Sequence, residues 1–238
     1  MMRKSAFASV TLTSLLLFGL VNSWGQEGEW INLFDGETLD GWSVHSGFAK
    51  YRVEDGTIVG TAVKKSPNTF LCTDREFGDF ILEFEVFLVN PELNSGVQFR
   101  SMIAKEEMVF WFRNNEGVLR PSSIPADRVY GYQVEIANES GGSSGGVYDE
   151  ARRAFMTPWW PEKGSKASKA FKNNQWNKYR IECKGASIRT IVNGTVVADF
   201  RDSLSESGII GLQVHDVGND STPYEVRWRN IRIMPLTE

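Results

Sequence analysis

The chain has 238 residues, 41% of them hydrophobic, and a formal net charge of −4. This mild acidic balance comes without a basic stripe, which argues against nucleic acid as a partner. The two cysteines, Cys72 and Cys183, are too few for a disulfide-rich scaffold, and neither lies at a metal-ligand spacing.

The chain begins with the layout of a secretory signal peptide. Arg3 and Lys4 form a basic start, an apolar run extends from Ala6 to Val21, and polar or turn-forming residues follow. The apolar run is too short for a comfortable membrane span, and no later segment is apolar enough to cross a bilayer. We predict a signal peptide over residues 1–25 and export to the periplasm or the exterior of a bacterium. The alternative is an uncleaved amphipathic anchor.

We predict a single all-β domain over residues 26–238, because short strand-like segments follow one another there with almost no helical period. Two hairpins are marked by their turns, Asp55-Gly56 in "YRVEDGTIVG" and Asn193-Gly194 in "SIRTIVNGTVVADF". The further strand-like segments are "DFILEFEVFLV", "SGVQFRS", "YGYQVEIAN", "NKYRIECKG", "GIIGLQVHDV" and "VRWRNIRIMPL". Such a series with Gly- and Asp-rich turns favours a sandwich of two antiparallel sheets.

Two long connections interrupt the series, residues 103–128 and residues 138–172. Connections of this length within a compact domain are usually functional loops or lids. The second contains "DEARRAF", for which we expect a single helical turn, and the aromatic pair Trp159 and Trp160.

Three strands share an unusual polar face. Successive strand residues point to opposite faces, so apolar residues line one face of "SGVQFRS", "GYQVEIA" and "GLQVHDV" and hydrogen-bonding residues line the other. The polar residues are Gln98, Arg100, Gln133, Glu135, Gln213 and His215. A solvated face favours Lys, Thr, Ser and Glu, whereas amides, an acid, a histidine and an arginine suit a sugar site. A lone strand histidine is more often structural than catalytic, and we interpret the other histidine, His45, as a surface residue.

Tryptophans and cysteines each leave two interpretations open. Indole rings form stacking platforms for sugars or fill the core, and we expect the core for Trp30, Trp42, Trp176 and Trp228. Cys72 and Cys183 either pair after export or stay free and buried in strands.

Eight motifs in order resemble the 3-keto-disaccharide hydrolase domain family. They are "WINLFDGETLDGW", "YRVEDGTIVG", "DFILEFEVFL", "NSGVQFR", "GYQVEI", "GGVYDEARR", "GLQVHDVG" and "VRWRNIRIMPL". The resemblance covers about residues 30–236 and implies a concanavalin-like jelly-roll β-sandwich. It also implies an enzyme that cleaves glycosides or disaccharides already oxidised at C3 by a separate oxidoreductase.

Such a substrate sets the chemistry of the site. A C3 ketone acidifies the C2 hydrogen, so a base can form an enolate that expels the glycosidic oxygen from C1, and hydration of the enone follows. The reaction needs a base near neutral pH and a positive or hydrogen-bonding group on the enolate oxygen, either a side chain or a divalent metal cation.

The polar face supplies candidates for each role. We predict His215 as the base and Glu135 as a second acid/base group or a metal ligand. The predicted contacts to sugar hydroxyls or the C3 oxygen are Gln98, Arg100, Gln133 and Gln213. From the second long connection, Tyr148 and Asp149 are predicted to reach the site, with Arg152 or Arg153 as companions, and Trp159 and Trp160 to stack on the aglycone or second sugar.

Two other functions stay open. A non-catalytic carbohydrate-binding domain explains the sandwich, the tryptophans and the polar face equally well. A conventional glycoside hydrolase would use closely spaced carboxylates on one strand face, for which Glu83 and Glu85 are the available pair. Asp149 also has a plain structural alternative, as the N-cap of the expected helical turn.

Overall fold

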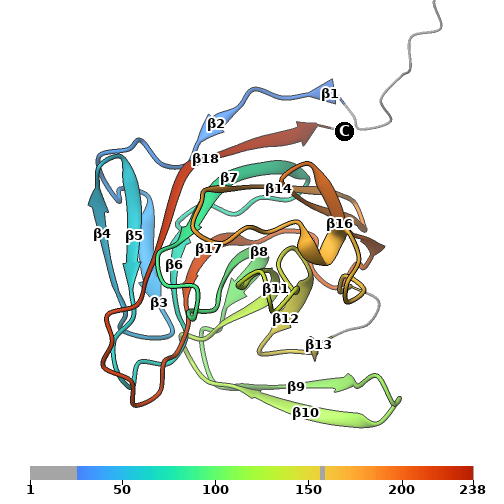
Figure 1. The fold of residues 1–238 in the computed structure, drawn as a ribbon. Coiled ribbons are helices and arrows are strands. Elements are labelled where there is room, and N and C mark those ends of the chain that lie inside the picture. Colours follow the sequence, from blue (N-terminus) through green and yellow to red (C-terminus); the bar gives the residue numbers. More distant parts are fainter. Residues whose placement is uncertain (1–25, 156–158, 238) are drawn as a thin grey trace, which may run out of the picture.

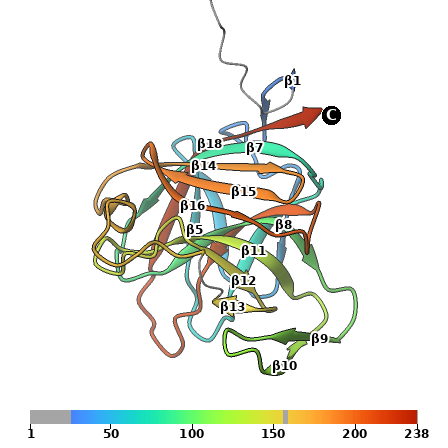
Figure 2. The ribbon, with the colours of Figure 1, turned by 90° about the vertical axis from the view of Figure 1, so that its right-hand side faces the viewer.

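The computed structural model describes residues 26–155 and 159–237, which form two antiparallel β-sheets packed face to face (Figure 1). The turned view in Figure 2 shows the same two layers, with the hairpin of β9 and β10 projecting beyond the lower one. The all-β, two-sheet prediction is confirmed. The predicted signal peptide lies outside the described residues.

The first sheet has nine strands within the described residues, in the order β16-β15-β14-β7-β18-β5-β4, with β1 and β2 also pairing with β18. Its strands are β1 (Gln26–Glu27), β2 (Ile31–Asn32), β4 (Lys50–Glu54), β5 (Thr57–Thr61), β7 (Phe80–Leu88), β14 (Asn177–Lys184), β15 (Ser187–Val192), β16 (Thr195–Arg201) and β18 (Glu225–Thr237).

The second sheet has seven strands within the same described ranges, in the order β13-β12-β11-β8-β17-β6-β3. Its strands are β3 (Trp42–His45), β6 (Thr69–Thr73), β8 (Ser95–Ile103), β11 (Val129–Ile136), β12 (Val147–Glu150), β13 (Ala154–Phe155) and β17 (Ile209–Val214).

The long connections are more ordered than the sequence suggested. Residues 103–128 contain a two-stranded hairpin of β9 (Met108–Arg113) and β10 (Leu119–Ile124). The helical turn expected in "DEARRAF" is wrong, because that segment is the end of β12, a turn and the short strand β13. The one helical element among the described residues is the 3-10 helix η1 (Ala167–Lys169).

Both predicted hairpin turns form. Asp55 and Gly56 have φ values of 50° and 69°, and Asn193 and Gly194 have φ values of 48° and 76°. Two successive left-handed residues match the right-handed twist of the flanking strands, which explains why Asp-Gly and Asn-Gly occur here.

The core lies between the two sheets and is built by strand alternation. Val97 and Phe99 of β8, Val134 of β11 and Leu212 of β17 face Phe84 of β7 within one buried cluster. Cys72 and Cys183 are both free and buried, and they belong to separate clusters. Burial raises the pKa of the Cys183 thiol to about 12, so it stays protonated at neutral pH.

The four tryptophans predicted to fill the core differ in how far they are buried. Trp228 is fully buried and Trp42 packs against the main cluster, as expected. Trp30 is 36% exposed, which contradicts the prediction, and the Arg232 guanidinium lies over its ring at 4.3 Å. Trp176 is half-buried, with the Arg229 guanidinium over its ring.

Candidate active site

A pocket of about 280 Å³ lies on the outer face of the seven-stranded sheet. Its lining residues are Asn68, Asn94, Gln133, Glu135, Tyr148, Glu150, Phe155, Gln213 and His215. β17, β8, β11 and β12 are neighbours in the sheet, so the polar sides of three predicted strands meet here. Gly96 of β8 makes room: a Cβ atom there would lie 2.5 Å from the Gln133 side chain.

The polar face is buried rather than solvated. Gln98, Gln133, Glu135 and Gln213 are each 7% exposed or less. A buried polar group is costly unless it finds a hydrogen-bond partner, so the pairing of each group indicates its role.

Three of these side chains form a chain of hydrogen bonds that ends at Glu135. Ser101 Oγ donates to Gln98 Oε1, and Gln98 Nε2 donates to Gln133 Oε1, both at 2.7 Å. Gln133 Nε2 then donates to Glu135 Oε1 at 2.7 Å. Gln98 and Gln133 are therefore occupied in orienting the Glu135 carboxyl.

The Glu135 carboxyl titrates near neutrality. Burial raises its pKa from the ordinary value of 4.5 to about 7. The hydrogen bonds from Gln133 and Asn94 act in the opposite direction, and the charge of Glu150 raises the pKa further. A carboxyl of this kind is suited to exchange protons at neutral pH.

Glu150 is the second acid of the pocket. Burial raises its pKa, while the Arg128 guanidinium and the neighbouring His215 act in the opposite direction. It forms an ion pair with Arg128. Glu150 is thus held by a cation, whereas Glu135 receives hydrogen bonds from two neutral amides.

Gln213 lies in the pocket with an unpaired amide. The residue is fully buried, and neither Nε2 nor Oε1 has a hydrogen-bond partner in the protein. Leaving both amide atoms unpaired costs several times what a made hydrogen bond contributes. The amide is therefore placed to donate to one ligand atom and accept from another.

His215 follows the last residue of β17 and is half-buried. Its Nδ1 lies 2.7 Å from the Asp216 carbonyl oxygen. Because a carbonyl only accepts, Nδ1 carries the proton in the neutral ring and Nε2 has the basic lone pair. His45 differs, since its ring nitrogens contact Asp127 Oδ1 at 2.6 Å and Ser43 Oγ at 3.0 Å.

The structure brings together Gln133, Glu135, Tyr148, Gln213 and His215, as the sequence predicted, with Gln98 supporting them from behind. Burial raises the pKa of Tyr148 to about 12, so its phenol remains a hydrogen-bond donor. Sequence reasoning missed Asn68, Asn94, Glu150 and Phe155. Strand alternation would have found Glu150, which shares a face with Tyr148 on β12.

Arg100 does not share the Gln98 face, and that prediction is wrong. β8 carries one extra residue here relative to both neighbours, since the register shifts between Tyr130 and Tyr132 and again between Ile209 and Gly211. Arg100 is the bulged residue, with a φ of 46°. Such a bulge reverses the alternation.

The Arg100 guanidinium points to the nine-stranded sheet instead. It donates to the carbonyl oxygens of Gly78 and Gly185 and pairs with Asp79 at 2.6 Å.

Asp149 and its arginines also lie outside the pocket. Asp149 faces the sandwich interior, where it is fully buried and forms ion pairs with Arg152 and Arg153. Arg153 also pairs with Asp202 at 2.8 Å. The N-cap alternative is wrong as well, because no helix begins at Asp149, a residue of β12.

The tryptophan pair does not line the pocket. Trp159 is buried in the core, stacked on Phe200 with ring centroids 4.4 Å apart. Trp160 is half-buried behind Phe155, at a centroid distance of 4.8 Å.

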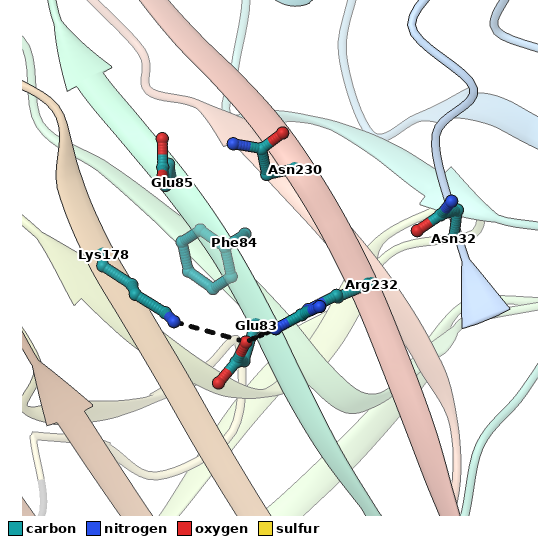
Figure 3. Close-up of a pocket in the computed structure, with 7 residues that line it drawn as sticks. All are labelled: Asn32, Glu83, Phe84, Glu85, Lys178, Asn230 and Arg232. Atoms are coloured by element: carbon teal, nitrogen blue, oxygen red, sulfur yellow. Dashed lines mark hydrogen bonds and ion pairs between the residues drawn. The ribbon is translucent and has the colours of Figure 1, made fainter. Parts of the chain in front are cut away.

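A second pocket, of about 330 Å³, lies on the nine-stranded sheet and contains Glu83 and Glu85 (Figure 3). Burial alone would raise the pKa of Glu83, but hydrogen bonds from Arg232 and Arg180 outweigh it and hold the pKa below its usual value. Glu85 pairs with Arg229 at 2.7 Å. Both carboxylates are paired with arginines, which argues against their use as a glycosidase acid pair.

Among residues 28–155 and 159–236, no group of three or more His, Cys, Asp or Glu side chains is arranged to hold a metal ion. Glu135, for which the sequence left a metal-ligand role open, lines the pocket together with His215.

A family model described as the 3-keto-alpha-glucoside-1,2-lyase-like domain matches residues 29–234. A comparison with curated protein sequences finds no match.

Solved structures with a similar fold include a proposed glycosyl hydrolase from Parabacteroides distasonis, 16% identical with a TM-score of 0.53, covering 88% of this chain and 94% of that one. An endo-β-galactosidase from Clostridium perfringens that releases GlcNAcα1-4Gal is 12% identical with a TM-score of 0.56, covering 89% and 62%. At these identities the likeness concerns the fold, a concanavalin-like sandwich.

Proposed function

Because the chain belongs to the 3-keto-alpha-glucoside-1,2-lyase-like domain family, we propose that it cleaves 3-keto-glycosides or 3-keto-disaccharides. The family membership confirms the resemblance drawn from the eight motifs. The observation that carries the proposed chemistry is the pocket itself, where a carboxyl with a pKa of about 7, Glu135, and a histidine occur together.

The reaction proceeds by elimination and hydration. A base removes the C2 hydrogen as a proton, and the electron pair of that bond forms the enolate with the C3 oxygen. The enolate collapses, the C1–O bond breaks, and the leaving oxygen takes a proton from an acid. Water then adds across the resulting double bond and yields the free 3-keto sugar.

His215 is the proposed base and Glu135 the proposed acid. The Asp216 carbonyl holds the histidine tautomer with Nε2 unprotonated, as proton removal requires. Glu135 is half-protonated near pH 7, so it holds a proton for the leaving oxygen. A conventional glycosidase pair is not required, because the ketone activates the substrate.

Gln213 is the proposed contact to the C3 oxygen. Its Nε2 donates to the ketone, and more strongly to the enolate, while Oε1 accepts from a neighbouring hydroxyl. The amides of Gln98 and Gln133 are already paired with each other and with Glu135, so the proposed role of these two residues changes from binding sugar to positioning Glu135.

The chemistry defines the preceding step. A glycoside does not carry a ketone at C3 until an oxidoreductase has removed two electrons and two protons from that alcohol, so a separate enzyme of this class supplies the substrate.

We also propose export by the predicted signal peptide. No helix among residues 26–155 and 159–237 is long and apolar enough to cross a membrane.

The test incubates the purified protein with a 3-keto-glucoside and with the unoxidised parent, each with and without a chelator. Release of the leaving alcohol from the keto compound alone is the expected result. Release from the parent would indicate a conventional glycoside hydrolase. Saturable binding without release from either would indicate a carbohydrate-binding domain.

A further inference from the structure

One edge of the pocket is aromatic, whereas the rest is polar. Phe155 is a pocket-lining residue and, at 61%, the most exposed large hydrophobic side chain among residues 28–155 and 159–236. An exposed phenylalanine beside buried amides and carboxyls presents apolar surface to whatever enters the pocket.

The Phe155 ring is held in place rather than loosely exposed. It packs edge-on against Tyr148, with centroids 5.0 Å apart and an interplanar angle of 74°, and tilted against Trp160. Its backbone pairs with Tyr148 across β12 and β13, and Asn115 Nδ2 from the β9–β10 loop donates to its carbonyl oxygen at 3.0 Å. A ring fixed from these sides loses little conformational freedom when a ligand stacks on it.

The polar and aromatic parts of the pocket come from different strands. Gln133, Glu135 and Gln213 belong to β11 and β17, in the middle of the sheet, whereas Phe155 belongs to β13, at its edge. A keto sugar with several hydroxyls fits the polar part. The group attached at C1 then extends toward one end of the pocket, and the aromatic end suits a flat apolar ring face.

We infer that Phe155 forms the binding site for the leaving group and makes the enzyme favour 3-keto-glycosides whose leaving group carries a ring, either a second sugar or an aromatic ring. This inference rests on the proposed function. It concerns which leaving groups are preferred and leaves the proton transfers unchanged.

The experiment compares three 3-keto-glucosides that differ at the leaving group, the methyl, cyclohexyl and phenyl compounds, with a 3-keto-disaccharide as a fourth. Methanol and cyclohexanol are similarly poor leaving groups, so their ratio reports ring binding rather than leaving ability. The variants are Phe155→Ala and a conservative Phe155→Tyr. The control is Trp111→Ala, because Trp111 on β9 is 59% exposed but does not line the pocket.

The wild type should prefer the cyclohexyl over the methyl compound in kcat/KM, and Phe155→Ala should reduce that preference about five- to tenfold, the magnitude of one lost aromatic contact. The loss should lie mainly in the KM of the cyclohexyl compound. Phe155→Tyr should retain the preference, and Trp111→Ala should not alter it.

Two results would overturn the inference while leaving the proposed function intact. One is an unchanged cyclohexyl-to-methyl ratio in Phe155→Ala. The other is an equal loss on both compounds, which would show a purely structural role. Absence of turnover of every keto compound by the wild type would instead refute the proposed function. The phenyl and disaccharide compounds show which ring is preferred.

Discussion

The outer faces of the two sheets differ in how far their polar groups are satisfied. On the nine-stranded sheet, the Glu83 carboxylate forms ion pairs with Lys178 and Arg232, as Figure 3 shows, and with Arg180. On the seven-stranded sheet, Glu135 is held by neutral amides, and both amide atoms of Gln213 are unpaired. Ion pairs that are complete within the protein leave little for a ligand to gain, so the incompletely paired face is the better candidate for chemistry.

Removal of the proposed base should have the largest effect. His215→Ala should lower kcat/KM on a 3-keto-glucoside by about 10³-fold, because proton transfer loses its positioned acceptor. The fold should persist, since His215 is half-buried and lies outside the core. Circular dichroism and the melting temperature check folding. Full activity in a folded variant would refute the assigned base.

Replacement of the proposed acid should come next. Glu135→Gln should lower kcat about 10²-fold on alkyl leaving groups, because an amide cannot supply the proton. In the wild type, activity should fall as the pH rises above about 7, where Glu135 loses its proton, and this fall should be absent in the variant. A 4-nitrophenyl leaving group needs no protonation and should restore much of the rate. Equal losses on both leaving groups would exclude the acid role.

The same variant should show a pH-dependent change in stability. The folded pKa of Glu135, about 7, lies above the ordinary value of 4.5, so its stabilising contribution is complete below pH 4.5 and is lost as the pH rises through 7. Glu135→Gln removes this loss. The variant should therefore gain stability relative to wild type between pH 5 and pH 8, by about 3 kcal/mol at most. Urea denaturation at the two pH values measures the difference.

A smaller catalytic effect is expected at the unpaired amide. Gln213→Leu should lower kcat/KM about 10- to 100-fold, because the C3 oxygen loses its donor. The variant should be more stable than wild type by about 1–2 kcal/mol, since a buried unpaired amide is replaced by an apolar side chain of similar size. Thermal melting and kinetics on one preparation test both effects. A loss of both stability and activity would indicate a structural role instead.

The nine-stranded sheet provides the contrasting variant with the smallest catalytic effect. Glu83→Gln should leave kcat/KM unchanged and lower stability by about 1–2 kcal/mol, because its arginines lose their partner. The pKa of Glu83 lies below its usual value, so its contribution is present above pH 4.5 and is lost as the pH falls through the lowered pKa. The stability difference from wild type should therefore shrink in acid. A large activity loss would revive Glu83 and Glu85 as a catalytic pair.

Local sequence rules predicted much of this molecule. The two-residue alternation put Gln98, Gln133, Glu135 and Gln213 on one face, and the Asp-Gly and Asn-Gly turns marked two hairpins correctly. These features depend on residues close together in the chain, so they can be read without the tertiary structure.

The tertiary structure decided the features that depend on which strands pair with one another. The bulge that turns Arg100 away exists only because β11 and β17 pair with β8 out of register there. Asp149 lies on the interior side of β12, where Arg152 and Arg153 neutralise its charge, and Phe155 gained its place at the pocket from the pairing of β13 with β12.

The sequence by itself therefore determined the all-β class, the family and the polar sheet face, because period, turn chemistry and motif order are local properties. Only the tertiary structure decided which polar groups are satisfied. Glu83 and Glu135 both lie on strands with alternating patterns, yet Glu83 meets arginines from two other strands, whereas Glu135 meets the amides of Gln133 on its own strand and of Asn94. Burial, which raises the pKa of Glu135, and the arginines that lower the pKa of Glu83 both come from residues far apart in the chain.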